Sequence, residues 1–443
     1  MLRTIQKYIT DRTAVKIASG VEEAIREAAL PAGAALPTVR ALAKRLEVSP
    51  ATVAAAYRTL QQRGMVASQG RRGTRVTYRP IFCARRKVCH RPGVRNLWDG
   101  NPDPALLPAM RPALATIDAT PRLYGQGLHD ANLLALLRRD FEDDGIGRGE
   151  VCVVNGAMDA IERVLSECLR AGDGVAVEDP GFGNVFDLVM SRGLSLRPVA
   201  LDGEGVIPDE LARACREGIK AVIITTRAHN PTGAAVTFGR GRELSRVLAG
   251  HPEVLLIEDD HAALIVEQPL ATVHQGRNGR WVYVRSFSKA LNPDLRLAAM
   301  TGDGVTMNQV IDRLIVGERW VSHVLQRVAH ALLSDHGVRQ DLARAARSYS
   351  QRREALMAAL LGRGLSPVAG RTGYNVWVPV PEETATVQGL DESGWGVGAG
   401  ERFRIQSPSA IRITAATLSP EESDRLASDL VAVSRPNYRT CTA

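Results

Sequence analysis

The sequence lacks any segment that is long and apolar enough to cross a membrane. No apolar run in its 443 residues approaches the roughly 20 residues that span a bilayer, although 45% of the residues are hydrophobic. Its first residues, M-L-R-T-I-Q-K-Y-I-T-D-R, also lack the apolar core and small-residue cleavage site of a secretory signal. We therefore expect a cytoplasmic protein that does not associate with membranes.

Cysteine is also scarce, and the six cysteines form no paired C-x-x-C motif. Thiols scattered in this way are expected to stay free in a reducing cytosol rather than form disulfides. Cys83, Cys89 and His90 come nearest to a zinc motif, but they provide only three ligands at an unusual spacing. We predict no bound metal.

Acidic residues are rare in the first part of the chain. Residues 1–95 contain 19 Lys and Arg but only 5 Asp and Glu, a net charge of +14, whereas the remainder contains 37 and 43, a net charge of −6. A basic head on an acidic body is typical of a protein whose N-terminal part binds nucleic acid. Charge alone leaves a solvated basic surface as the alternative.

The basic part begins with helical patterns. Helices are predicted over residues 13–29 and, after Leu36-Pro37, over residues 38–46. The first helix is expected to place its apolar residues on one side: Val15, Ile17, Val21, Ala24, Ile25 and Ala28.

A further helix and a hairpin follow. The helix is predicted over residues 49–63, because Ser49 is a natural N-cap and Pro50 fits the first helical position. Residues 65–68 and 74–77 alternate in polarity around the sequence Q-G-R-R-G, which predicts a two-stranded wing with a basic tip.

Two helices joined by a tight turn and followed by a basic hairpin indicate a winged helix-turn-helix. In that arrangement the second helix of the pair enters the major groove, so the pattern predicts binding of double-stranded promoter DNA. A helical hairpin that is merely a packed subdomain is the alternative. The expected DNA contacts come from the helix pair and the wing tip: Arg40, Ser49, Thr52, Arg58, Arg71 and Arg72.

We divide the chain into a winged helix-turn-helix domain (1–78), a basic linker (79–96) and a large domain (97–443). The linker contains six Lys and Arg, no acidic residue and no clear period. In the large domain, strand and helix signals alternate, which predicts an α/β fold with a mostly parallel sheet and helices on both faces. The clearest strand signals lie at residues 151–154, 175–177, 221–225, 254–257 and 281–285.

Residues 285–296, R-S-F-S-K-A-L-N-P-D-L-R, combine groups that would hold pyridoxal 5′-phosphate (PLP). Lys289 follows an apolar strand signal and is the candidate for the Schiff base with the cofactor. Ser286, Ser288 and Arg296 provide hydroxyls and a guanidinium for its phosphate. A plain surface lysine is the alternative.

Two other stretches supply anion-binding and charged groups. Asn155-Gly156-Ala157-Met158 follows a strand and opens a helix, so the N–H groups of Ala157 and Met158 are expected to face the phosphate. PLP also needs a carboxylate beside its ring nitrogen, which keeps that nitrogen protonated. Asp259 is our candidate, and its neighbours Glu258 and Asp260 are the alternatives.

Two further side chains fit the ring of the cofactor. Asn230, in H-N-P-T-G, offers an amide that can donate to the 3-hydroxyl group. Phe182, in D-P-G-F, can stack on the ring face, although it can equally be an ordinary core aromatic.

These motifs carry a family resemblance. Residues 13–77, with L-P-T-V-R-A-L-A and V-S-P-A-T-V-A-A-A-Y-R-T-L, resemble the GntR family of bacterial regulators. The order G-A-M, D-P-G-F, H-N-P-T-G, D-D-H and S-F-S-K resembles fold-type I aminotransferases from about residue 100 to about residue 430. Together they resemble the MocR subfamily, and G-N-P-D-P and W-V-S-H look closest to its PtsJ branch.

The resemblance implies further roles. It implies a small C-terminal subdomain, a homodimer formed through the large domain, and Arg412 as the residue that holds a ligand carboxylate. It implies that Tyr124 approaches the phosphate, often from the neighbouring subunit. The chain departs from the aminotransferase pattern at His261, where that family has a tyrosine, and at Met158, where a polar residue is common. The change at His261 is compatible with PLP binding but predicts inefficient transamination.

We therefore predict a transcription regulator that senses PLP or its aldimine state and governs vitamer, amino-acid or amine metabolism. An aminotransferase with a DNA-binding appendage is the first alternative. A DNA-binding scaffold with a decayed cofactor site is the second.

Overall fold

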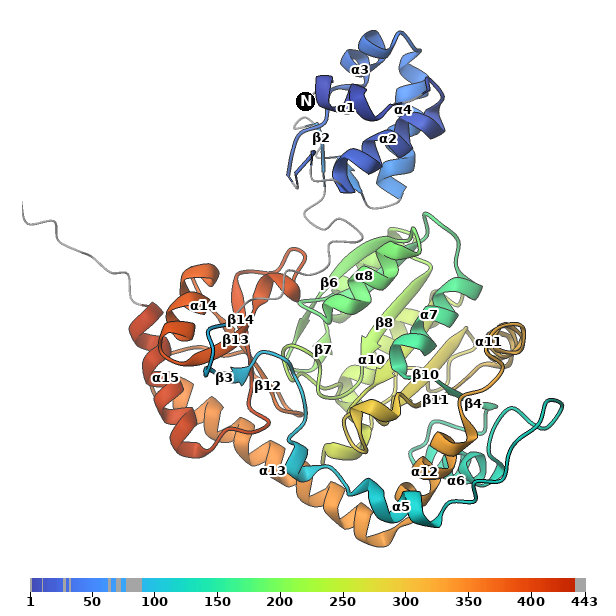
Figure 1. The fold of residues 1–443 in the computed structure, drawn as a ribbon, viewed down its shortest axis with the longest axis vertical. Helices are drawn as coiled ribbons and strands as arrows, with labels where there is room; N and C mark the ends of the chain where they lie inside the picture. Colours follow the sequence, from blue (N-terminus) through green and yellow to red (C-terminus); the bar gives the residue numbers. More distant parts are fainter. Residues whose placement is uncertain are drawn as a thin grey trace, which may run out of the picture. The chain divides into compact units, whose positions relative to one another are not determined.

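The computed structural model describes residues 2–9, 11–26, 29–31, 33–62, 65–68, 73–76 and 90–434. Its N-terminal part is a helical domain with a small antiparallel hairpin (Figure 1). The apolar core of this part draws fully buried side chains from four helices, among them Ile5, Ile17, Leu42 and Val53. The elements of this part are α1 (Leu2–Tyr8), α2 (Ala14–Arg26), α3 (Val39–Leu46), α4 (Pro50–Gln62), β1 (Val66–Ser68) and β2 (Thr74–Val76).

Local capping explains where the helix pair begins. The Thr38 side chain accepts from Ala41 N at 3.2 Å at the start of α3, and Ser49 Oγ accepts from Thr52 N at 3.1 Å at the start of α4. Glu47, in the left-handed region with φ 55°, ends α3. The predicted winged helix-turn-helix is confirmed, with helix boundaries within one residue of those expected for this pair.

The predicted apolar side of the first helix is wrong at one position. Ile17 and Val21 are fully buried, but Val15 is 69% exposed. Val15 precedes Ile17 by two residues, which places it about 200° around the helix from the buried stripe. Ala28, Arg71 and Arg72 lie outside the described residues.

The C-terminal part contains an eight-stranded sheet in the order β4-β11-β10-β9-β8-β5-β6-β7. β8, β9 and β10 run parallel, whereas β11 is antiparallel to both β10 and β4, and β6 and β7 form an antiparallel pair. The strands are β4 (Val151–Val154), β5 (Gly174–Asp179), β6 (Ser195–Asp202), β7 (Gly205–Val206), β8 (Ala221–Thr225), β9 (Leu255–Asp260), β10 (Trp281–Ser286) and β11 (Ala298–Gly302).

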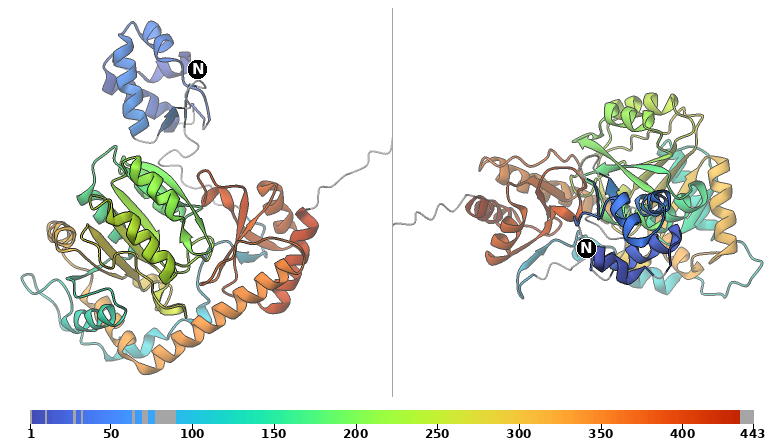
Figure 2. Two further views of the ribbon diagram at one scale, coloured as in Figure 1. Left: turned by 180° about the vertical axis from the view of Figure 1, so that it is seen from behind. Right: turned by 90° about the horizontal axis from the view of Figure 1, so that it is seen from above.

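Helices cover both faces of this sheet, as the views in Figure 2 show, so the predicted α/β architecture is confirmed. β4, β8 and β9 are almost entirely buried, in keeping with their continuous apolar character, whereas β6 is mostly half-buried or exposed. The helices of this part are α5 (Met110–Thr116), α6 (Ala131–Asp143), α7 (Ala157–Cys168), α8 (Gly183–Ser191), α9 (Pro208–Arg216), α10 (Phe238–Ala249), α11 (Gly304–Val316), α12 (His323–Ser334), α13 (His336–Leu361), α14 (Glu383–Glu392) and α15 (Pro420–Ser434).

A smaller sheet has the strand order β12-β14-β13-β3. Its strands are β12 (Asn375–Pro379), β14 (Ala410–Thr414), β13 (Trp395–Ala399) and β3 (Arg95–Leu97). Most of its residues come from the C-terminal end of the chain, in agreement with the small subdomain that the family resemblance implied. β3 is the exception, since it pairs in parallel with β13 although about 300 residues separate them.

The structure differs from the sequence prediction at the end of the linker. Residues 95–96 were assigned to the linker, but Arg95 and Asn96 belong to β3 and are paired with Trp395 and Gly396. A three-residue strand at a sheet edge has no detectable period of its own, so its pairing depends on the partner strand.

Three described cysteines, Cys152, Cys168 and Cys215, are free thiols. Among the residues that the structure describes, no group of three or more His, Cys, Asp or Glu is arranged to hold a metal ion. Within the same ranges, no helix is both long and apolar enough to span a membrane.

Candidate cofactor site and DNA-binding surface

Lys289 lies in the turn after β10 with its amine largely withdrawn from solvent. Its Nζ donates to Gly100 O at 2.5 Å, and Tyr374 OH donates to the same oxygen at 3.2 Å. Burial lowers the pKa of Lys289 to about 8 and the nearby Arg412 cation adds to this effect, while Asp99 opposes it. An amine with this pKa loses its proton near neutral pH, as a nucleophile toward an aldehyde must.

The three neighbouring carboxylates of β9 have different environments. Glu258 is fully buried and accepts from Val273 N at 2.7 Å and from the His274 ring at 2.5 Å. Asp260 is also fully buried and is paired with Arg227 and with Tyr283 OH.

Asp259 differs from both neighbours because one of its oxygens has no partner. Its Oδ1 is buried without a hydrogen bond among the described residues, and its Oδ2 lies 3.8 Å from His261 Nδ1. Buried polar atoms are rarely left unpaired in folded proteins. Of the three candidates, Asp259 alone therefore offers an acceptor to a ligand.

Arg412 and Asn230 form a contact next to Lys289. Arg412, on β14, is 3% exposed and donates through Nη1 to Asn230 Oδ1 at 3.1 Å and through Nη2 to Trp98 O. The bond uses the oxygen of the Asn230 amide and leaves its NH₂ group as the donor that the 3-hydroxyl requires. Burial lowers the pKa of Arg412 to about 10, so the side chain stays charged at neutral pH.

The start of α7 and Arg296 lie side by side. A Cβ built on Gly156 would lie 3.2 Å from Arg296 Nη2, and Gly156 has φ +97°, so a side chain here would be both strained and crowded. The first-turn N–H groups of Ala157 and Met158 have no carbonyl partner within the helix. The guanidinium and the helix start therefore form a site of the kind that binds phosphate.

Three other predicted cofactor residues are Ser286, Phe182 and Tyr124. Ser286 Oγ accepts from Ser288 N at 3.3 Å within the same turn as Lys289. Phe182, between β5 and α8 in the sequence, is partly buried. Tyr124 is 83% exposed, and its ring packs 5.5 Å from Trp320 rather than against the groups around Lys289.

Sequence reasoning missed three contributors to the site. Asp99 and Gly100 follow β3 after Trp98, and Tyr374 precedes β12 and is 5% exposed. The G-N-P-D-P motif beginning at Gly100 was a signal, but it gave no indication that a carbonyl would meet Lys289. Only the pairing of β3 with the C-terminal sheet brings these segments together.

The predicted DNA contacts divide into exposed cations and capping residues. Arg40 near the start of α3 and Arg58 on α4 are exposed. Ser49 and Thr52 share a hydrogen bond of 2.8 Å between their hydroxyls at the start of α4. These two hydroxyls therefore contribute to the cap at the start of α4.

The residues present fit PLP. The chain offers a buried amine of lowered pKa, a buried carboxylate oxygen without a partner and a guanidinium beside a helix start. These are the groups that an aldehyde, a pyridine nitrogen and a phosphate require.

Comparison with known proteins identifies both parts of the chain. Residues 13–76 match the family of bacterial regulatory proteins called the gntR family, and residues 129–430 match aminotransferase class I and II. The fold and the site thus define a DNA-binding regulator with an aminotransferase-like domain. The chain belongs to the MocR-type GntR regulators.

Among its relatives is the vitamin B6 salvage pathway transcriptional repressor PtsJ of Salmonella typhimurium. The two are 39% identical over 424 residues, which cover 95% of this chain and 98% of the repressor. The transcriptional regulator TauR of Rhodobacter capsulatus is 28% identical over 406 residues, or 82% of each chain.

Solved aminotransferase structures share the fold of the large domain. Kynurenine aminotransferase of Pyrococcus horikoshii superposes with a TM-score of 0.70 at 21% identity, covering 77% of this chain and 90% of the enzyme. The α-aminoadipate aminotransferase LysN of Thermus thermophilus gives 0.69 at 22% identity, covering 77% and 93%. The protein is therefore a PLP-binding transcription regulator, as the sequence predicted, and the comparisons do not favour the aminotransferase alternative.

Proposed function

We propose that this regulator binds promoter DNA with an affinity that depends on PLP occupancy and that it controls genes of vitamin B6 salvage. The name of its Salmonella relative supports the choice of genes. The observation that carries the proposal is the buried, unpartnered oxygen of Asp259, on the strand paired with β10, which leads to Lys289 and its lowered pKa.

Each site residue has a separate task toward the cofactor. Lys289 provides the attacking amine, and Asp259 holds the proton on the pyridine nitrogen. Asn230 donates to the 3-hydroxyl group while Arg412 fixes its amide orientation. The cofactor, when bound, supplies an electron-poor ring and an aldehyde to this lysine.

The other residues orient the cofactor or receive a second ligand. Arg412 is a cation that can bind the carboxylate of an effector. His261 stands where aminotransferases have a tyrosine and contacts Asp259 instead, which supports sensing over turnover. The phosphate is held by Ala157 and Met158 N–H, Ser286, Ser288 and Arg296, with Phe182 on the ring face and Tyr124 donated by a second subunit.

On the DNA side, the start of α4 enters the major groove. Ser49 and Thr52 meet base edges, Arg58 and Arg40 bind the phosphate backbone, and the wing residues Arg71 and Arg72 reach phosphates or the minor groove. We further propose a cytoplasmic homodimer formed through residues 97–443, with residues 1–78 as the DNA-binding domain and the linker starting at residue 79.

Fluorescence anisotropy with the promoter DNA upstream of its own gene tests the coupling. Wild type should show an affinity that changes several-fold on PLP addition, whereas Lys289→Ala should show no change. Identical affinities for wild type with and without PLP, despite an absorbance band for bound cofactor, would contradict the proposal. Conversion of bound PLP to its amine form by common amino acids would instead support an enzyme.

A further inference from the structure

Residues 90–100, here called the strap, connect the site around Lys289 to the chain that leads into the DNA-binding domain. The strap contains β3 and ends at Gly100, and residues 77–89 alone separate it from the wing strand β2. The start of the strap contacts α14 and α15, whereas its end contacts residues of the cofactor site.

At the end of the strap, two backbone carbonyls accept hydrogen bonds from Lys289 and Arg412, the two cations proposed to bind ligands. Gly100 O accepts from Lys289 Nζ at 2.5 Å, and Trp98 O accepts from Arg412 Nη2. Asp99, between them, raises the pKa of Lys289 and of Arg412 against the effect of burial. The strap thus presents both carbonyls and a carboxylate to the groups that PLP and an effector carboxylate need.

The close approach at Gly100 depends on the absence of a side chain. Gly100 has φ +69°, and a Cβ built on it would lie 3.2 Å from Arg412 Nη1. An L-residue would be strained in this conformation and would press on the guanidinium. The backbone is therefore shaped for contact with Arg412 at this one position.

The start of the strap is held by polar contacts with α14, α15 and the residue before β13. His90 Nδ1 lies 2.8 Å from Asp391 Oδ1, and Arg95 N donates to Gly394 O at 2.8 Å. Arg95 also reaches Glu422 on α15 through Nε at 3.0 Å and through Nη2 at 3.4 Å. None of these contacts involves a predicted cofactor residue.

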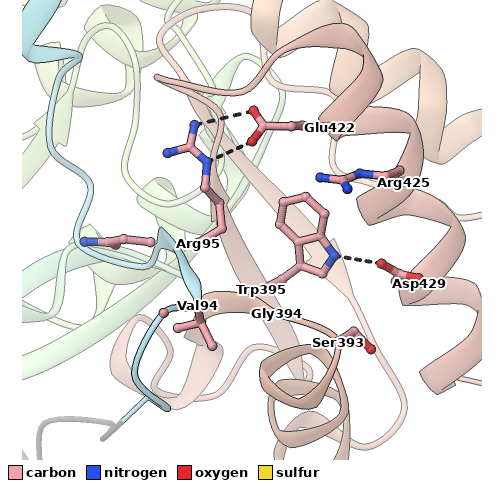
Figure 3. A pocket seen from close by; sticks show the side chains of 10 residues that line it. Val94, Arg95, Ser393, Gly394, Trp395, Glu422, Arg425 and Asp429 are labelled. Atoms are coloured by element: carbon pink, nitrogen blue, oxygen red, sulfur yellow. Dashed lines mark hydrogen bonds and ion pairs between the residues drawn. The ribbon is translucent and has the colours of Figure 1, made fainter.

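A polar pocket of about 460 Å³ lies beside this half of the strap, between it, the start of β13 and α15 (Figure 3). Arg95 extends along the pocket to Glu422, and the Trp395 indole donates to Asp429 Oδ2 at 2.7 Å at its edge. The strap therefore borders open space along residues 93–96, although β3 itself is paired with β13.

We propose that the strap is an internal competitor for the cofactor site, which PLP releases by withdrawing Lys289 from the Gly100 carbonyl. When the amine and the aldehyde carbon form a C=N bond, the aldehyde oxygen leaves as water with both protons of the neutral amine. The nitrogen then carries an N–H only if it takes up a proton again, and it has lost the other donors that the ammonium group offered to Gly100 O. The strap then loosens at its end and passes this change toward the DNA-binding domain.

The same competition extends to effectors with a carboxylate. Such a ligand binds Arg412 through charge-assisted bonds and displaces the neutral Trp98 carbonyl, because ionised acceptors bind a guanidinium more strongly. PLP alone frees one strap contact, and a carboxylate ligand frees the second. This inference rests on the proposed function, since it assigns the means by which PLP occupancy reaches the DNA-binding domain.

Hydrogen–deuterium exchange of the full chain tests the release. PLP should raise amide exchange in residues 95–101 by roughly tenfold in wild type, the factor expected for about 1.4 kcal/mol of lost contact. Lys289→Ala should exchange at the raised rate without PLP, and PLP should add nothing. An absorbance band with unchanged or slower exchange would overturn the strap alone, whereas the lack of any band would overturn the proposed function with it.

A second arm loosens the start of the strap instead. Glu422→Gln weakens the contact with Arg95 and should shift the DNA affinity of the PLP-free protein toward the PLP-loaded value. Asp424→Asn is the matched control. Asp424 lies on the same helix as Glu422, two residues away, and pairs with Arg363, which follows α13 and is not part of the strap. If both variants shift the DNA affinity equally, or if neither variant shifts it, the proposal is wrong.

Discussion

At the scale of single residues, two adjacent aspartates have different environments. Asp259 and Asp260 are neighbours on β9, yet only Asp260 has its charge fully paired within the fold. An unpaired buried oxygen lowers stability until a ligand satisfies it, whereas a paired buried carboxylate becomes costly only when its partner is removed. Substitutions at the two positions should therefore separate cofactor binding from folding.

Asp259→Asn should weaken PLP binding by roughly 10- to 100-fold, the equivalent of about 1.5–3 kcal/mol for a hydrogen bond to a charged group. Its PLP-free melting temperature should be equal to or above that of wild type, since the amide is cheaper to bury than a carboxylate. Asp260→Asn should instead destabilise the fold by about 3 kcal/mol or more, because Arg227 is left unpaired. Absorbance titration and thermal unfolding measure the two effects, and a stability loss in Asp259→Asn equal to that in Asp260→Asn would contradict this assignment.

The lowered pKa of Lys289 predicts the pH dependence of cofactor attachment. The neutral amine reacts, so the attachment rate should rise about tenfold from pH 6 to pH 7 and level off above the pKa of about 8. Folding lowers this pKa, so the unfolding free energy of the PLP-free protein should increase as pH rises from about 8 to 10.5. Stopped-flow absorbance gives the profile. Arg412→Gln should move its midpoint upward, and a midpoint near 10 in wild type would show that the amine is not desolvated.

At the scale of elements, the start of α4 has a structural role in its cap and a proposed role in DNA recognition. Ser49 Oγ accepts from Thr52 N and shares a hydrogen bond with the Thr52 hydroxyl. Removal of an N-cap costs about 1 kcal/mol, whereas aspartate is an equally good cap. Because an added carboxylate is repelled by DNA phosphates, the two tasks can be separated at this one position.

Ser49→Asp should keep stability within about 0.5 kcal/mol of wild type and weaken promoter binding at least tenfold, an effect of about 1.4 kcal/mol. Ser49→Ala should lower stability by about 1 kcal/mol. Urea unfolding and anisotropy measure the pair of effects. If Ser49→Asp binds promoter DNA as tightly as wild type, α4 does not enter the groove by this end.

At the scale of the whole molecule, charge is divided between the two ends of the sequence. Residues 1–95 carry a net charge of +14 and the remainder −6. Phosphate contacts by the basic part release counterions, so the logarithm of the DNA affinity should fall linearly with that of the salt concentration. The amine of Lys289 and the carboxylate of Asp259, which are proposed to bind PLP, are in contrast largely buried, and salt screens buried charges poorly.

Arg40→Ala and Arg58→Ala should each reduce the slope of this salt dependence by about 1 and leave PLP affinity unchanged. Arg139→Ala, an exposed arginine on α6, is the control and should leave both quantities unchanged. Anisotropy titrations at several salt concentrations provide the slopes. An equal change in the slope from Arg139→Ala would place the DNA elsewhere on the protein.

Periodicity, capping and turn chemistry are local, so the sequence alone determined the winged helix pair, the parallel core strands and the order of the cofactor motifs. The Lys289 and Arg412 assignments needed only their motifs and the family resemblance. Tertiary structure decided which of Glu258, Asp259 and Asp260 has a free oxygen, because that depends on partners far along the chain. It also decided the pairing of β3 with β13, which brings Gly100 against Lys289. Contacts across about 190 residues leave no periodic trace in the sequence, since any backbone carbonyl can accept the same hydrogen bond.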